Sequence, residues 1–178
     1  MPAKKSPLTI FTIGHSTHTL PQFIDMLKHY GITCLADIRT IPRSRHVPQF
    51  NEHPFSIALK HVHIKYTHLT ELGGLRHTHK DSINTAWHNA SFRGFADYMQ
   101  TEAFSTGIEK LLELAKKGHV AIMCAEAVPW RCHRSLVGDA LLVRGINVED
   151  IFSLTSAKPH TLTPWAQVEG TNITYPKK

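Results

Sequence analysis

Residues 120–134 read VAIMCAEAVPWRCHR, and this stretch decides how the rest of the chain can be arranged. It opens with a run of apolar residues, which is typical of a short strand buried on both faces of a sheet. The thiol of Cys124 and a loop with carboxylate, guanidinium and imidazole groups follow directly. Apolar residues then recur at helical spacing from Leu136 to Val143. In an α/β protein, a strand, a polar loop and a helix in this order present ligand-binding groups beyond the carboxyl end of the sheet.

The same alternation extends through the chain. Apolar runs predict strands at residues 8–13, 32–38, 64–69, 120–123 and 148–154. Helical periodicity predicts helices at residues 20–30, 51–62, 92–99, 106–118 and 136–143. Residues 70–89 lack periodicity, and a loop of this length is usually functional or mobile. The pattern predicts a single α/β domain over residues 1–178, a three-layer sandwich around a mostly parallel sheet. Its core is expected at about residues 8–155, with a polar C-terminal tail at 156–178.

Composition narrows the class of partner. The chain has 178 residues, a net charge of +6 and 14 further histidines, a balance that favours an anionic partner such as a phosphate group, a nucleotide or nucleic acid. The three cysteines are too few for a disulfide framework, and their odd number favours a reducing cytoplasm. No apolar run approaches the roughly 20 residues that span a bilayer, so no membrane association is expected.

Three of the predicted strands end in polar loops. His15 and Ser16 follow the first strand, residues 39–45 follow the second, and residues 124–134 follow the fourth. The carboxyl ends of parallel strands meet at one edge of a sheet, so these loops are expected to share one cleft.

Arginine is concentrated in these loops, at Arg39, Arg43, Arg45, Arg131 and Arg134. Guanidinium groups suit bidentate recognition of phosphate or carboxylate. Arg134 is also expected at a helix N-terminus, where free backbone N–H groups attract anions. The alternative for any one of these arginines is a structural ion pair with Asp37, Glu126 or Asp139.

Cys124 has two interpretations. A thiol at a strand end among guanidinium groups is placed as a nucleophile, because positive charge lowers its pKa. Cysteine is also among the most frequently buried residue types, which favours plain packing. Phosphatase loops separate Cys and Arg by five residues, whereas six separate Cys124 from Arg131. Glu126 is either an ion-pair partner or a general acid/base. No cysteine and histidine spacing matches a zinc site, so neither a metal nor another cofactor is expected.

Four ordered segments resemble one family. These are TIGHS at residues 12–16, DIRTIPRS at 37–44, LGGLR at 72–76 and MCAEAVPWRCHR at 123–134. They are similar to the hallmark segments of the domain of unknown function 488 family, uncharacterised bacterial and archaeal α/β proteins, over residues 9 to about 160. The resemblance implies a compact cytoplasmic α/β domain. It also implies a set of family-pattern residues: His15, Ser16, Asp37, Arg39, Pro42, Ser44, Gly73, Gly74, Arg76, Cys124, Glu126, Cys132, His133 and Arg134.

These observations predict one site for an anionic, phosphate-bearing ligand. The predicted catalytic residues are Glu126, His133 and Cys124. The predicted substrate-binding residues are His15, Ser16, Asp37, Arg39, Ser44, Arg76, Arg131 and Arg134. One hypothesis is an enzyme, a hydrolase or transferase acting on a phosphate-bearing or nucleotide substrate. A second is a non-catalytic nucleic-acid-binding module that stacks bases on Trp87, Phe92 and Trp130. A third is a small-molecule sensor. The sequence does not indicate the oligomeric state.

Overall fold

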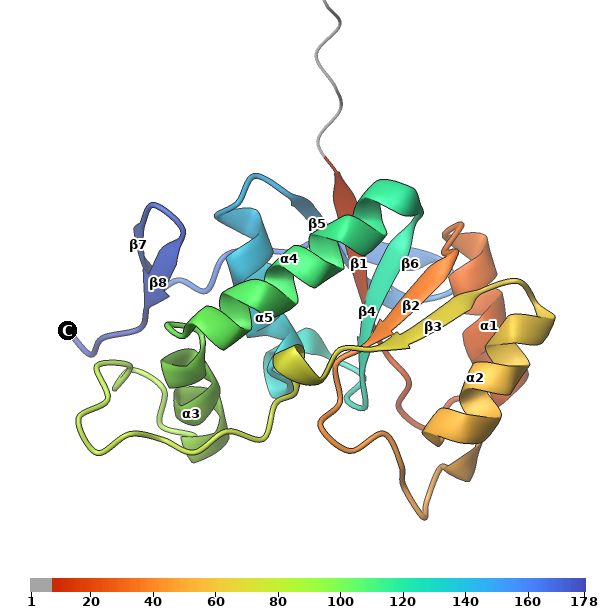
Figure 1. The fold of residues 1–178 in the computed structure, drawn as a ribbon, viewed down its shortest axis with the longest axis horizontal. Helices are drawn as coiled ribbons and strands as arrows, with labels where there is room; N and C mark the ends of the chain where they lie inside the picture. The colour runs from red at the N-terminus through yellow and green to blue at the C-terminus, as the bar shows by residue number, and fades with distance from the viewer. Residues whose placement is uncertain (1–7) are drawn as a thin grey trace, which may run out of the picture.

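A six-stranded sheet forms the centre of the protein (Figure 1). The computed structural model describes residues 8–178, and the first seven residues lie outside the described part. The strands are β1 (Thr9–Gly14), β2 (Cys34–Asp37), β3 (Lys65–His68), β4 (Val120–Cys124), β5 (Asn147–Ser153) and β6 (Ser156–Pro159). Their order in the sheet is β3-β2-β4-β1-β5-β6. Every neighbouring pair is parallel except β5 and β6. The predicted α/β fold with a mostly parallel sheet is therefore confirmed.

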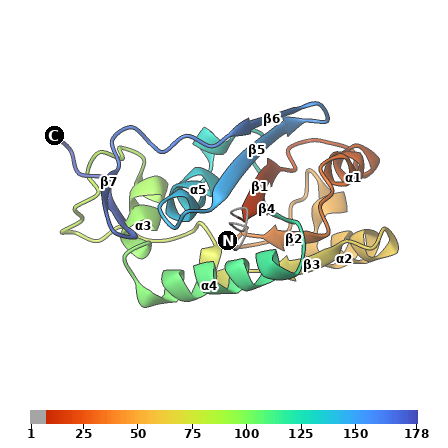
Figure 2. The same ribbon diagram turned by 90° about the horizontal axis from the view of Figure 1, so that it is seen from above.

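Helices cover both faces of this sheet (Figure 2). They are α1 (Leu20–His29), α2 (Glu52–His61), α3 (Ala90–Tyr98), α4 (Glu102–Lys117) and α5 (Arg134–Leu142). Helices α1 and α2 pack Phe23 and Phe55 onto one face, in a cluster with Met123 of β4. The other three helices pack on the opposite face, where Phe95 and Ile122 belong to a second cluster. Successive residues of β4 thus enter different clusters, which explains why this strand is an unbroken apolar run.

The predicted helix starts are correct for α1 and wrong for α4. Helix α1 begins at Leu20 as predicted, and Thr19 and Gln22 form a capping box at its start. Helix α4 begins at Glu102, four residues before the predicted start, and its N-cap is Thr101, whose side chain accepts a hydrogen bond from the backbone N–H of Phe104. Phe104 is buried and extends the apolar stripe of α4 by one turn, so packing favours the earlier cap.

The segment predicted to be a polar tail is part of the fold. It contains the edge strand β6 and a hairpin of β7 (Gln167–Glu169) and β8 (Asn172–Thr174). Ile173 and Tyr175 are buried in the core cluster that includes α3, α4 and α5. The core therefore extends beyond residue 155. The prediction missed this because Ile173 and Tyr175 alternate with the polar residues Asn172 and Thr174 and give little apolar signal. Within residues 8–178, none of the helices combines the length and the apolarity needed to cross a membrane.

The strand order creates a crevice at one edge of the sheet. From β1 the chain passes through α1 to β2 on one side, and from β4 it passes through α5 to β5 on the other side. Neighbouring strands whose connections leave in opposite directions form a topological switch point, where ligands bind in open α/β sheets. The register aligns Gly14 of β1 and Asp37 of β2 with Cys124 and Met123 of β4, so the three loops begin at one level.

Candidate functional site

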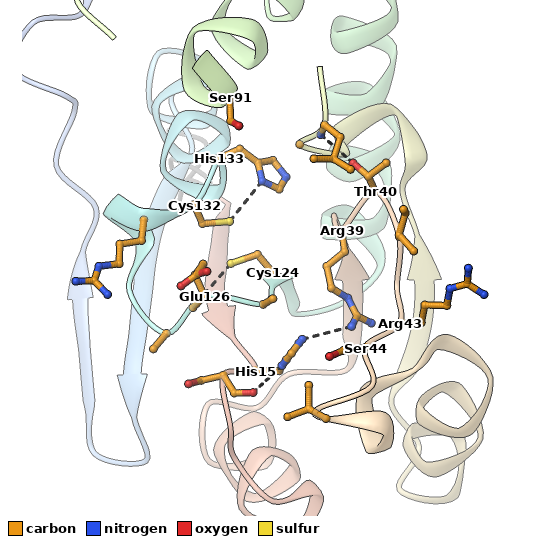
Figure 3. A pocket seen from close by; sticks show the side chains of 18 of the residues that line it. His15, Arg39, Thr40, Arg43, Ser44, Ser91, Cys124, Glu126, Cys132 and His133 are labelled. Atoms are coloured by element: carbon orange, nitrogen blue, oxygen red, sulfur yellow. Dashed lines mark hydrogen bonds between the residues drawn. The ribbon is translucent and has the colours of Figure 1, made fainter. Parts of the chain in front are cut away.

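A pocket of about 840 Å³ lies at this edge. The loops after β1, β2 and β4 form its walls, together with residues 74–75 and the start of α3 (Figure 3). Eight of the predicted site residues line it: His15, Ser16, Arg39, Ser44, Cys124, Glu126, Arg131 and His133. Asp37, Arg76 and Arg134 do not line it, and their contacts hold the lining residues from behind. The three strand-end loops thus meet at one cleft.

Cys124 lies at the base of the pocket in contact with Arg134. The Nε atom of Arg134 donates a hydrogen bond to the Cys124 Sγ atom at 3.1 Å. Burial raises the pKa of the Cys124 thiol. The hydrogen bond from Cys132, and the charge and hydrogen bond of Arg134, outweigh burial and hold this pKa below its usual value. The site therefore favours a thiolate at Cys124.

Arg134 is fully buried, and its contacts differ from those predicted. Its NH1 group donates to Thr12 Oγ1 at 2.8 Å, and its NH2 group donates to the carbonyl oxygens of Glu126 and Ala127 at 3.0 and 3.4 Å. Among residues 8–178, no carboxylate lies within ion-pair distance of this guanidinium. Asp150 is linked to the guanidinium only indirectly, because the Thr12 hydroxyl that accepts from Arg134 donates to the Asp150 carboxylate. Arg134 is thus neither an open anion-binding group nor the ion-pair partner of the Glu126 or Asp139 carboxylate. It contacts the Cys124 sulfur directly.

Cys132 and His133 complete this wall of the pocket. His133 Nε2 lies 2.9 Å from the carbonyl oxygen of Ile38 and 3.0 Å from that of Leu72, so it must carry a proton and donate. Burial is the main reason that the pKa of His133 is lowered to about 4, which keeps the ring neutral. Its Nδ1 atom is then an acceptor, 3.4 Å from the Cys132 sulfur. Both ring nitrogens are engaged within the protein, so His133 positions Cys132.

His15 and Arg39 form the opposite wall. A guanidinium only donates, so the Arg39 NH1 group donates to His15 Nε2 at 3.3 Å. His15 Nδ1 then donates to the Ser16 carbonyl oxygen at 2.9 Å. Burial lowers the pKa of His15, and the charge of Arg39 acts in the same direction, so the ring is a neutral tautomer. Asp37 accepts from Arg39 Nε and NH2, the latter at 2.8 Å, and the Tyr66 hydroxyl donates to the same carboxylate. Asp37 therefore holds Arg39 in place.

Arg76 braces the loop that carries the two adjacent glycines. It donates to the carbonyl oxygens of Gly73 at 3.1 Å and Thr70 at 2.9 Å, and its guanidinium lies 3.7 Å from the centre of the Tyr98 ring. Gly74 packs against His133, so Arg76 acts on the pocket through this loop.

The exposed charges of the pocket come from Arg43, Arg131 and Glu126. Arg45 lies in the same loop as Arg43 but lines a neighbouring depression instead. The five clustered arginines are thus divided between Arg39 and Arg134, which are buried and internally bonded, and three that are exposed.

The three aromatic residues predicted to stack bases are dispersed. Trp87 packs against the rings of Trp165 and Tyr175, with centroids 5.1 and 5.5 Å away. Phe92 lines the pocket. Trp130 is 64% exposed and packs beside Phe152, outside the pocket lining.

Sequence reasoning missed several residues of the site. Thr12, in the middle of β1, accepts a hydrogen bond from Arg134. The feature of the sequence that could have indicated this role is a threonine within an otherwise apolar strand. Thr40 lines the pocket and accepts a hydrogen bond from the backbone N–H of Leu75 at 2.9 Å. Asn89 and Ser91, at the start of α3, also line the pocket. No pattern in the sequence placed this helix start near the ends of the strands. Over residues 8–178, no group of three or more His, Cys, Asp or Glu side chains is arranged to hold a metal ion.

Comparison with known proteins identifies the family. No curated protein and no solved structure matches the chain. The family model described as "Domain of unknown function DUF488" matches residues 19–141, which span β2, β4 and most of α5. The match includes Arg39, Cys124 and Arg134, and it begins after His15 and Ser16. The chain belongs to the DUF488 family.

Proposed function

We propose that the protein is an enzyme, a hydrolase or transferase, that acts on a phosphate-bearing substrate with Cys124 as the nucleophile. The observation that carries this proposal is the contact between Arg134 Nε and Cys124 Sγ at the base of a pocket with arginines at its mouth. A buried cation is costly unless an anion balances it, and the Cys124 sulfur is the group in direct contact that can become anionic. The proposed nucleophile is thus activated by a permanent charge.

The exposed side chains supply the remaining roles. Arg43 and Arg131 bind the phosphate oxygens from two different loops, because a guanidinium offers paired donors to such an anion. The thiolate attacks phosphorus, and the ester oxygen leaves with a proton from the acid form of Glu126. The Glu126 carboxylate then takes a proton from the water or alcohol that releases the phosphoryl group and restores the thiolate. Glu126 fits this role better than His133, since the nitrogens of His133 are already engaged.

Free thiols accord with a reducing compartment. All three cysteines are unbridged and lie within the described residues. We therefore propose a cytoplasmic location, where a reducing environment keeps the Cys124 thiol free to react.

Turnover of p-nitrophenyl phosphate tests the nucleophile. We expect the wild type to release p-nitrophenol and Cys124→Ser to lose at least about a thousandfold in rate. Cys34→Ser is the matched control, because Cys34 is a buried cysteine at the opposite end of the sheet, paired with Val120. It should retain the wild-type rate. Full activity of Cys124→Ser would overturn the assignment, and binding without turnover would favour a sensor.

Binding of inorganic phosphate tests the proposed role of Arg43 and Arg131. Phosphate should raise the melting temperature of the wild type, because a ligand that binds only the folded state stabilises it. Arg43→Gln and Arg131→Gln should each weaken binding by roughly ten- to a hundredfold, the usual loss of one charge-assisted interaction. Arg45→Gln, in the same loop but outside the pocket, is the control and should leave the shift intact. Equal phosphate-induced shifts of the melting temperature in all three variants would argue that Arg43 and Arg131 do not bind the phosphate.

A further inference from the structure

We propose that Cys124 and Cys132 form a reversible disulfide when a hydroperoxide enters the pocket, with Cys124 oxidised first and Cys132 as the resolving thiol. This modification goes beyond the proposed function and does not require turnover. It rests on the paired placement of two thiols on one pocket wall, each held by a different neighbour.

The two thiols belong to the same side of the pocket. Figure 3 shows Cys132, from the end of the loop, next to Cys124 at the end of β4, with the Cys132 sulfur hydrogen bonded to His133. They lie close enough to shift each other's pKa in opposite directions: Cys132 lowers the pKa of Cys124, and Cys124 raises that of Cys132. Forming the bond brings the sulfurs to about 2.05 Å, and the loop between them contains no regular element except the short 3₁₀ turn Pro129–Arg131. The loop can therefore adjust without the loss of a helix or strand.

The neighbours give the two thiols different roles. Arg134 donates to Cys124 and stabilises its thiolate, which is the form that attacks a peroxide. Cys132 lies between two acceptors, the Cys124 sulfur and the His133 Nδ1 atom at 3.4 Å. Together with burial, the hydrogen bond and charge of Cys124 raise the pKa of Cys132 well above its usual value, so Cys132 remains a protonated thiol beside the thiolate.

The chemistry balances in two steps. The Cys124 thiolate attacks the outer oxygen of the hydroperoxide, and the O–O bond breaks. Cys124 is oxidised to a sulfenic acid, and the peroxide is reduced to an alcohol or water that takes one proton from solvent. The Cys132 sulfur then attacks the Cys124 sulfur, the S–O bond breaks, and the proton of Cys132 leaves with the hydroxyl group as water. A small external thiol reverses the bond by exchange.

Cys34 provides an internal comparison. It is buried at the start of β2, paired in register with Val120, at the other end of the sheet from the pocket. Burial raises the pKa of its thiol. Cys34 should therefore stay reduced under conditions that oxidise Cys124.

Peptide mass spectrometry tests the proposal on the full chain. The reduced protein is treated with one equivalent of hydrogen peroxide, alkylated in denaturant and digested with trypsin without reduction. Cleavage after Arg131 separates the peptide of residues 118–131 from that of residues 132–134, so the disulfide appears as a linked pair of these peptides. We expect the linked pair in the wild type and in Cys34→Ser, its loss on adding dithiothreitol, and alkylated Cys34 in the wild type.

Two variants distinguish the oxidation of Cys124 from the later attack by Cys132. Cys132→Ser should lose the linked pair completely and accumulate a sulfenic acid on Cys124 that dimedone traps. Cys124→Ser should leave Cys132 alkylated. The proposal is overturned if wild-type Cys124 and Cys132 remain fully alkylated, if Cys124 pairs with Cys34, or if Cys132 oxidises equally in Cys124→Ser. None of these readouts depends on p-nitrophenyl phosphate, so failure of the proposed function and failure of the disulfide are distinguishable.

Discussion

Arg134 has the most consequential contacts of any single residue in the site. It joins Cys124 at the base of the pocket to Thr12 in β1, and through that hydroxyl to Asp150 in β5. Three neighbouring strands therefore depend on one fully buried guanidinium. Its donors have a fixed planar geometry that a lysine does not reproduce. Arg134 thus couples the reactivity of the thiol to the packing of the sheet.

Removal of the Arg134 charge should make the Cys124 thiol less acidic. In Arg134→Gln the pKa of Cys124 should rise toward the ordinary value of about 8.5, because the neutral side chain no longer favours the thiolate. Alkylation of Cys124 by iodoacetamide, followed by site-resolved mass spectrometry from pH 5 to 10, should show its midpoint at higher pH than in the wild type. Near-ultraviolet circular dichroism checks that the variant is folded. The same midpoint in both folded proteins would show that Arg134 does not control the thiol.

Close backbone approaches set the shape of the loops between the elements. A Cβ atom on Gly14 would lie 1.6 Å from the carbonyl oxygen of Glu126, so the chain leaving β1 touches the loop after β4. A Cβ atom on Gly74 would lie 2.5 Å from His133 Nδ1, so the loop between β3 and α3 touches the same segment from the other side. Two glycines thereby allow three loops to meet at one pocket.

Alanine at these two positions should destabilise the protein to different extents. Gly74→Ala should lower the free energy of unfolding by roughly 1–3 kcal/mol, the usual cost of overpacking. Gly14→Ala should cost more, because its obstacle is backbone that cannot rotate away. Urea unfolding measures both, and Ser91→Ala, an exposed change at the same pocket, is the control. A smaller loss for Gly14→Ala than for Gly74→Ala would contradict the close approach between β1 and the loop after β4.

At the scale of the whole molecule, His160 ties the C-terminal segment to the sheet and to α5. Its Nδ1 and Nε2 atoms lie 2.9 Å from Asp150 and 3.0 Å from Asp139. The Tyr175 hydroxyl donates to the same Asp139 carboxylate at 2.8 Å. Burial lowers the pKa of His160, but the two carboxylates outweigh it and raise this pKa to about 9. The folded protein therefore holds a charged His160 at neutral pH.

Because the pKa of His160 is raised, we expect the folded protein to become less stable as the pH rises. The folded protein binds the proton of His160 more tightly than the unfolded chain, whose histidines titrate near 6.5. The stabilisation, roughly 3 kcal/mol at most, is therefore fully present below about pH 6.5 and is lost as the pH rises through about 9. Urea unfolding of the wild type and His160→Gln should show a difference that shrinks between pH 6 and 9. A constant difference across that range would mean that His160 is neutral in the folded protein.

The helices and strands from β1 to β5, and their order along the chain, could be predicted from local patterns. The apolar run before Cys124 has the signature of a doubly buried strand, and the capping box at Thr19 marks the start of α1. Parallel strands place their carboxyl ends at one edge whatever their detailed packing, so the convergence of His15, Arg39 and Cys124 at one pocket also followed from the pattern.

The direction in which each side chain of the site points was decided by tertiary packing alone. Arg131 and Arg134 are three residues apart in one motif, yet Arg131 is exposed at the pocket and Arg134 is buried beneath it. The same holds for the end of the chain, where the sequence indicated Tyr175 as a residue that attaches the tail but not its bond to Asp139 in the core. A sequence pattern records the chemical type of a side chain and its spacing along the chain. The partners of Arg134 and Tyr175 come from strands and helices distant in sequence, and no local pattern specifies such contacts.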